Sequence, residues 1–259
     1  MIPIVAAVVA VGHHVAYAQS AIAPAAEPTE PGLEILITPY LWLPWVGVSA
    51  HPADSRIPSK STVISPVELF GHLTWVPFMG EAEFRYGPFA LITDYIHAPL
   101  TAGVSTHDIL FSGANAGLTL DTGSAMLMYR SIIQPDQYVD VGIGARAWGL
   151  AGNISLDQGV LPSVSVANGL SWGDPLIGAR YHRDFDNRFG ATAYADVGGF
   201  GAGAHIDWQL VGTIDYSYDS RIDLHAGLRS LNFNFGAPRA NIQLNMLGPI
   251  ITLTYRLSG

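Results

Sequence analysis

The chain has no cysteine, a single lysine and few charged residues. The lack of cysteine excludes disulfide bonds, thiolate metal sites and a cysteine nucleophile. Charged residues make up 13% of the sequence, whereas about a quarter is usual in soluble proteins. Lys60 is the only lysine among 12 basic residues, and the arginines suit enclosed ion pairs of fixed geometry. The net charge of −9 argues against a nucleic-acid partner, which would need a basic surface.

Long apolar runs are also lacking. After the N-terminus, no segment offers the roughly 18 uncharged apolar residues that a membrane-spanning helix needs. Residues 1–18 are predicted to be a secretory signal peptide, because Ile2–Val11 is mostly apolar and Ala16-Tyr17-Ala18 fits a cleavage site. Residues 19–32 are proline-containing and are predicted to be a flexible lead-in. An exported chain without a spanning helix can cross a membrane only as a closed β-barrel.

What the sequence does contain is a repeated alternation of apolar and polar residues. In Trp208–Tyr218 the even positions are apolar or aromatic, and all odd positions except Val211 are polar. Successive side chains of a strand point to opposite faces, so each such segment has one apolar and one polar face. Charged residues lie on the polar side in several of these segments. A barrel in lipid would turn the apolar face outward and enclose the charged residues.

Turn chemistry divides residues 33–259 into ten predicted strands, although eight or twelve would also fit. The predicted limits are 34–48, 73–86, 88–100, 118–133, 137–152, 170–183, 189–203, 206–218, 222–235 and 244–257. Four connections are tight, near residues 87, 135, 185 and 220, and they alternate with longer links such as 101–117 and 153–169. This is the pattern of an antiparallel up-and-down outer-membrane barrel with short periplasmic turns and longer extracellular loops. The fold class is therefore predicted to be all-β, with a single transmembrane domain and both termini on the periplasmic side.

Aromatic residues gather near both ends of the predicted strands. The tyrosines near the periplasmic ends are Tyr86, Tyr181, Tyr218 and Tyr255, and the tryptophans near the other ends are Trp42, Trp45, Trp148, Trp172 and Trp208. Amphipathic rings favour the two lipid–water boundaries, so these residues are predicted to form two girdles. In 222–235 the apolar residues change parity from Leu228 to Leu231, Phe233 and Phe235, which indicates a bulge or emergence from the lipid band.

Several short motifs along the chain carry a resemblance to a known family. They are Thr38–Trp42, Phe78–Arg85 with its Gly-Pro turn, Leu91–Tyr95, Trp172–Arg180, Asp196–Gly203 with Trp208-Gln209, and Gly248–Ile251. In these motifs the chain resembles a family of bacterial outer-membrane β-barrel proteins without an assigned activity. The resemblance covers residues 33–257 and implies the fold and a location in the bacterial outer membrane. It brings no catalytic residues with it.

The polar strand faces are predicted to place a network of charges in the lumen. Its members are Glu81, Glu83, Arg85, Asp94, Arg130, Asp140, Arg146, Asp174, Arg180, Asp196, Asp215, Asp223, Arg229 and Arg256. Side chains fill the interior of a barrel of about this size, so isolated charges would be costly there and paired contacts are expected. The near balance of acids and arginines favours a salt-bridged plug, and the slight excess of acids leaves open a narrow, weakly cation-preferring pore.

Enzymatic patterns are weak. The histidines do not follow zinc-site spacing, and no cofactor or metal site is expected. A lipid-modifying enzyme would need a nucleophile system at the outer rim, for which Ser105, His107, Asp108 and Ser112 are the nearest candidates. We therefore expect a non-enzymatic barrel with a structural or interaction role, and a diffusion pore as the main alternative.

The partners follow from this location. We expect outer-membrane lipid and lipopolysaccharide around the barrel, the barrel-assembly machinery during biogenesis, no nucleic acid, and a monomeric protein.

Overall fold

The computed structural model describes residues 32–52, 60–71, 77–105, 111–158, 164–237 and 240–258. The predicted signal peptide, 1–18, and all of the predicted lead-in except Gly32 lie outside these residues. The described part of the chain contains one short helix and a set of long strands. No helix in these ranges has the length and apolarity that a membrane crossing requires.

The strands follow one another along the chain with a single helix between the third and the fourth. Their bounds are β1 Leu33–Trp42, β2 Trp45–Pro52, β3 Lys60–Ile64, α1 Pro66–Gly71, β4 Phe78–Tyr86, β5 Phe89–Ser105, β6 Phe111–Gln134, β7 Gln137–Gln158, β8 Val164–Asp184, β9 Phe189–Gly198, β10 Ile206–Ser217, β11 Ile222–Ala237 and β12 Ala240–Ser258.

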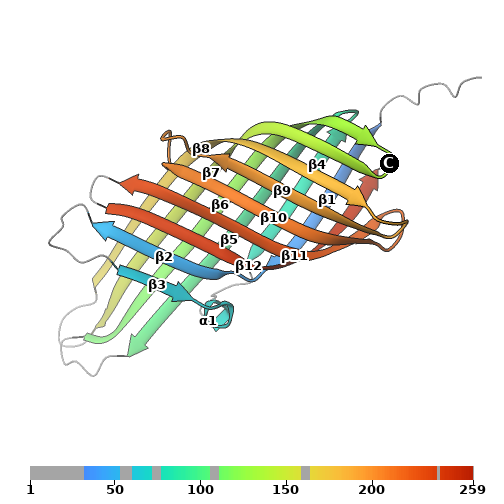
Figure 1. Ribbon diagram of the computed structural model, residues 1–259. Helices are drawn as coiled ribbons and strands as arrows, with labels where there is room; N and C mark the ends of the chain where they lie inside the picture. The colour runs from blue at the N-terminus through green and yellow to red at the C-terminus, as the bar shows by residue number, and fades with distance from the viewer. Residues whose placement is uncertain are drawn as a thin grey trace, which may run out of the picture. The chain divides into compact units, whose positions relative to one another are not determined.

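Ten of these strands close into a ring. Strands β4 to β12 pair with their neighbours in chain order, β1 pairs with β4, and β1 also pairs with β12. All of these pairs are antiparallel, and Figure 1 shows the tilted strands of the resulting barrel. Because each of these ten strands has a neighbour on both sides, the ring that they form has no free edge. The sequence-based prediction of about ten strands in an up-and-down barrel is confirmed.

The predicted first strand, 34–48, is two strands in the structure. It breaks at Leu43-Pro44, where the backbone N–H of Leu43 donates to the carbonyl of Pro249 at 3.0 Å. Above the break, β2 pairs with β12 on one side and with β3 on the other. The two strands β2 and β3 are therefore additions to the outer end of the ring.

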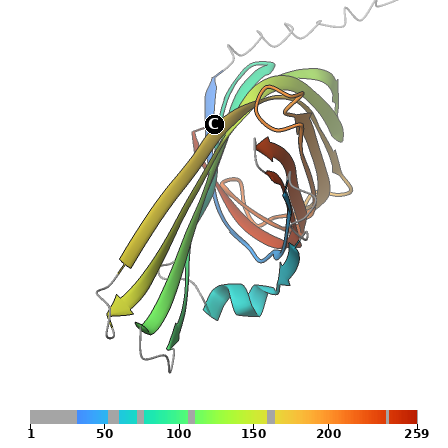
Figure 2. The ribbon, with the colours of Figure 1, turned by 90° about the vertical axis from the view of Figure 1, so that its left-hand side faces the viewer.

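Strands β5 to β8 are longer than the alternation predicts. A membrane-spanning strand needs about 9–11 residues, whereas β6 has 24 and β7 has 22. The segments 101–117 and 153–169, predicted as loops, are mostly strand, because backbone pairing above the membrane does not require apolar alternation. Figure 2 shows these strands projecting past the rest of the ring.

The outer surface of the ring is apolar. Ile143, Ile214 and Ile251 are 65%, 56% and 61% exposed, and Leu210 and Leu228 are exposed as well. Leaving so much apolar surface in water would be unfavourable, and hydrocarbon would cover it without cost. Tyr86, Tyr181, Tyr218 and Tyr255 are exposed near the short-turn end, where the inner girdle is predicted.

The predicted outer girdle is wrong for three of its tryptophans. Trp45 is half-exposed on the outside, but Trp42 and Trp148 are buried inside the barrel, and Trp172 packs against them there. In β11 the pairing with β10 and β12 has no register shift, so the parity change at Leu231 is not a bulge. Leu231 and Phe233 are buried instead, because the lining of the lumen itself becomes apolar at this height.

Candidate functional site: the barrel lumen

The lumen has two layers. The half near the short turns encloses a cavity of about 510 Å³ with a largely polar and charged lining. The predicted network residues on its wall are Glu81, Glu83, Arg85, Asp94, Arg130, Arg180, Asp215, Asp223, Arg229 and Arg256. The other four, Asp140, Arg146, Asp174 and Asp196, are buried or nearly so and do not line this cavity.

One group of charges joins three arginines through two acids. Asp140 accepts from Arg130 Nε at 2.8 Å, from Arg85 at 2.9 Å and from Arg180 at 2.7 Å. Glu83 bonds both Arg180, at 2.7 Å, and Arg85, at 2.9 Å. These residues come from β4 and from the consecutive strands β6, β7 and β8, so the group links four strands through charge-assisted bonds. The NH1 group of Arg85 is buried without a partner in the described residues.

A second group surrounds Arg146 at the upper limit of the charged layer. Its guanidinium donates to Asp207 at 2.6 Å and to Asp196 at 2.7 Å. The Trp148 indole N–H donates to the other carboxylate oxygen of Asp207 at 2.9 Å. Asp174 on β8 accepts a hydrogen bond from the backbone N–H of Ala204 at 2.6 Å. This bond fixes the turn between β9 and β10.

Arg229 occupies the opposite wall. It donates to Asp94 at 2.9 Å and to Gln209 at 2.7 Å, and Tyr40 bonds both Asp94 and Arg229 at 2.7 Å. Asp94 therefore points into the lumen.

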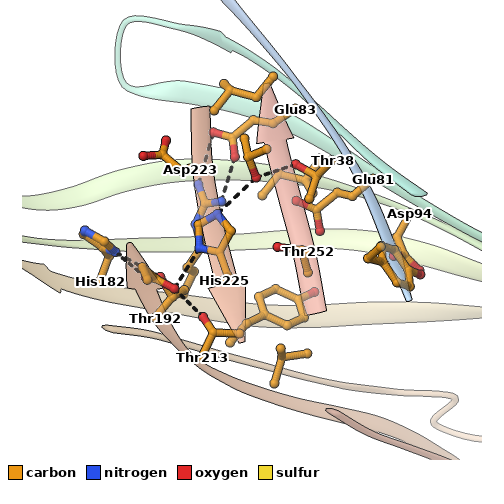
Figure 3. A pocket seen from close by; sticks show the side chains of 18 of the residues that line it. Thr38, Glu81, Glu83, Asp94, His182, Thr192, Thr213, Asp223, His225 and Thr252 are labelled. Atoms are coloured by element: carbon orange, nitrogen blue, oxygen red, sulfur yellow. Dashed lines mark hydrogen bonds and ion pairs between the residues drawn. The ribbon is translucent and has the colours of Figure 1, made fainter. Parts of the chain in front are cut away.

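Asp215 is surrounded by hydroxyl and imidazole groups rather than by arginine. Thr192 and Thr213 donate to its carboxylate, and His225 lies 2.8 Å and His182 3.3 Å from it. Figure 3 shows both imidazoles in this part of the cavity.

The remaining predicted residues are loosely held. Arg256 lies 3.6 Å from Glu34 and 4.0 Å from Asp223, near the open end of the cavity. Glu81 has no hydrogen bond or ion pair within the described ranges, although it faces the same space.

Several residues of the site were not predicted from the sequence. Asp207, Gln209, Tyr40, His182 and His225 all take part in the contacts above. Alternation along the strand predicts that most of these side chains point inward. Asp207 and Gln209, for example, alternate with the outward Trp208 and Leu210. Which carboxylate meets which arginine depends on strand register around the ring, which one sequence does not give.

Above the charges, apolar side chains fill the lumen. The buried members are Trp42, Ile96, Trp148, Ala204, Leu231, Phe233, Leu244, Met246 and Ile250. Trp148 lies 5.9 Å from Trp172 and 4.7 Å from Phe233, measured between ring centroids. All except Ala204 come from strands, namely β1, β5, β7, β11 and β12, so they form an apolar layer across the lumen, with the charged cavity on its periplasmic side.

One chain of contacts has the order of a hydrolytic triad. Asp215 contacts His225 Nδ1 at 2.8 Å, and His225 Nε2 lies 3.1 Å from the hydroxyl of Thr254. The hydroxyl of Thr38 lies 2.8 Å from that of Thr254 on its other side. The paired strands β10, β11 and β12 use their backbone N–H groups in the ladder, so these strands offer no pair of free donors for an oxyanion. We interpret this chain of contacts as part of the polar scaffold.

The outer-rim candidates for lipid chemistry are not described in full. His107 and Asp108 lie outside the described residues. Ser105 ends β5 and Ser112 lies in β6, which places both on the projecting sheet.

Comparisons with known proteins identify the fold of the chain and do not identify its activity. No protein-family model and no curated protein matches the sequence. Among solved structures, the fold is similar to the outer membrane protease OmpT from Escherichia coli, with a TM-score of 0.57 and 7% identity over 88% of this chain and 97% of that chain. The transport unit of the autotransporter AIDA-I from Escherichia coli has a TM-score of 0.42 and 10% identity over 91% of this chain and 94% of that chain. Ail of Yersinia pestis has a TM-score of 0.31 and 11% identity over 86% and 99%.

The closed ring, its apolar exterior and its charged interior define a class. The protein is a transmembrane β-barrel of the bacterial outer membrane, with ten strands in the ring and two more at its outer end.

Proposed function

We propose that the protein is a non-enzymatic outer-membrane barrel whose lumen is closed to ions and whose role is structural or one of interaction. The observation that carries the proposal is the apolar layer, in which Trp148 is 2% and Phe233 3% exposed. A hydrated ion would have to lose its water to pass such a layer. The ion-pair groups below it hold neighbouring strands together and leave few charges free to conduct.

The projecting part of β5 to β8 is the surface that we propose for interaction. It extends beyond the length that a membrane crossing uses, so lipopolysaccharide or another cell surface would meet it first. A diffusion pore is the alternative function, and the acids on the cavity wall are the feature that favours it.

Planar-bilayer recording tests this proposal. We expect wild-type protein to show no reproducible channel openings. Trp148→Ala combined with Phe233→Ala removes two neighbouring rings from the layer, and we expect small, cation-preferring openings in this variant because the cavity below carries an excess of acids.

Trp45→Ala is the matched control, since it removes a tryptophan from the outer surface. It should stay closed. Reproducible conductance of the wild type or of Trp45→Ala would reject the closed lumen in favour of the pore. A double variant that stays closed would show that these two rings are not what closes the lumen.

The non-enzymatic part has its own test. We expect purified protein to hydrolyse p-nitrophenyl acetate no faster than a detergent blank. The variant Thr254→Val should not change that rate, because we assign Thr254 and His225 to the scaffold. Ester turnover that this variant abolishes would overturn the assignment.

A further inference from the structure

The charged cavity is open toward the periplasm. Its lining includes Glu34, Asp184 and Asp223, which lie at the ends of β1, β8 and β11 next to the short turns. The apolar layer closes the other end. A small molecule would therefore reach the cavity from the periplasmic side, past these three carboxylates and Arg256, which lies 3.6 Å from Glu34 and 4.0 Å from Asp223.

Deeper in the cavity, Glu81 is a carboxylate without a protein partner in the described residues. The strand register sets Glu81 directly opposite Asp94 on β5 and opposite Thr38 on β1. Two acids in directly opposite positions repel each other. Asp94 is satisfied by Arg229 and Tyr40, whereas Glu81 carries no contact line in Figure 3. The network therefore leaves one inward carboxylate without a hydrogen bond or ion pair in the described residues.

A second polar group near Glu81 is also unsatisfied. The hydroxyl oxygen of Thr252 is buried and has no hydrogen-bond partner. Thr252 pairs with Tyr40 on β1, whose other edge pairs with β4, so Thr252 and Glu81 lie on either side of the same strand. Figure 3 shows Thr252 and Glu81 facing the same space. Buried polar groups are normally paired, so two unpaired groups in one cavity indicate a place for a ligand with donors.

The rest of the wall limits what that ligand is. Ile92, Met126, Ile250 and Tyr194 add apolar and aromatic surface to the cavity. No group of three or more acids and histidines in the described residues is arranged to hold a metal ion. A bare metal ion would need several oxygen ligands, whereas an ammonium group can use one carboxylate and one hydroxyl while its hydrocarbon part contacts the apolar wall.

We propose that the cavity is a periplasm-facing binding site for a small organic ammonium ion, with Glu81 as its counter-ion and the Thr252 hydroxyl as a second acceptor. The inference goes beyond the structural role proposed above. It holds whether or not the apolar layer blocks ions, because the ligand enters and leaves on the same side.

The test uses benzylamine as the probe, titrated into purified protein in detergent micelles and followed by isothermal titration calorimetry. We expect saturable binding to the wild type. Glu81→Gln keeps the size of the side chain and removes its charge, and it should weaken binding at least tenfold. Thr252→Val should weaken binding by a few fold. Benzyl alcohol, which lacks the charge, should bind no better to the wild type than to Glu81→Gln.

Asp186→Asn is the matched control, because it removes one acid from a periplasmic turn outside the cavity. It should bind benzylamine like the wild type. Glu81→Gln also relieves the repulsion from Asp94, so this variant should fold at least as well as the wild type in a heat-modifiability gel. Absence of saturable binding to the wild type, or equal affinity of the wild type, Glu81→Gln and Thr252→Val, overturns the site. The bilayer recordings decide the closed lumen separately.

Discussion

Arg146→Met is expected to destabilise the barrel by about 3–5 kcal/mol, because it leaves two buried aspartates without their cation. Arg146 is 2% exposed and bonds both Asp196 and Asp207. The loss should appear as a lower urea midpoint for unfolding in detergent micelles, with an unchanged slope.

The control for this prediction is Arg183→Met. Arg183 and Asp136 form an ion pair of 3.8 Å in which both side chains are about half-exposed, so its loss should cost less than about 1 kcal/mol. Adding Asp196→Asn and Asp207→Asn to Arg146→Met should recover part of the stability, because neutral amides are less costly to bury than unpaired carboxylates. If Arg146→Met were no more harmful than the control, the buried ion pairs would not be holding the strands in place.

The sequence predicts the ring well because lipid and lumen impose opposite polarity on alternate residues. Ile214 and Asp215 are neighbours, and the first is exposed on the outside while the second is buried inside. A two-residue period of this kind survives even where the strand limits are uncertain. The number of strands follows from the turns between such segments.

The same rule fails where both faces of a strand become apolar. Tryptophan is common at the lipid boundary, and this preference predicts Trp42, Trp148 and Trp172 there, but all three lie inside with Phe233 and Leu231. Composition does not distinguish a tryptophan at the membrane surface from one in a packed interior. Parity does, since Trp148 shares its face with Arg146 rather than with Ala147. The apolar layer, which carries the proposed function, was therefore missed.

For the charged residues, the local sequence sets the direction of each side chain, whereas the pairing between strands sets its partners. Alternation along β4 and β5 predicts that Glu81 and Asp94 point inward. Only the register between the two strands sets these residues opposite each other. The excess carboxylate of the cavity is a property of the pairing between strands. One sequence gives the members of the network and not their partners.

The apolar exterior provides the last prediction. Ile214→Arg is expected to lower stability in a bilayer by about 2–4 kcal/mol, because it places a charge near the middle of the hydrocarbon layer. Ile214 is 56% exposed and lies on β10 between Trp208 and Tyr218, which are near the two boundaries. Leu257→Arg is the control, since Leu257 is also exposed but lies beyond Tyr255 at the periplasmic end, where the same change should cost about 0–1 kcal/mol. Unfolding of both variants by guanidinium from lipid vesicles measures the difference. Equal stabilities would mean that hydrocarbon does not cover Ile214, whereas a clear penalty for Ile214→Arg alone would give the depth of the barrel in the membrane.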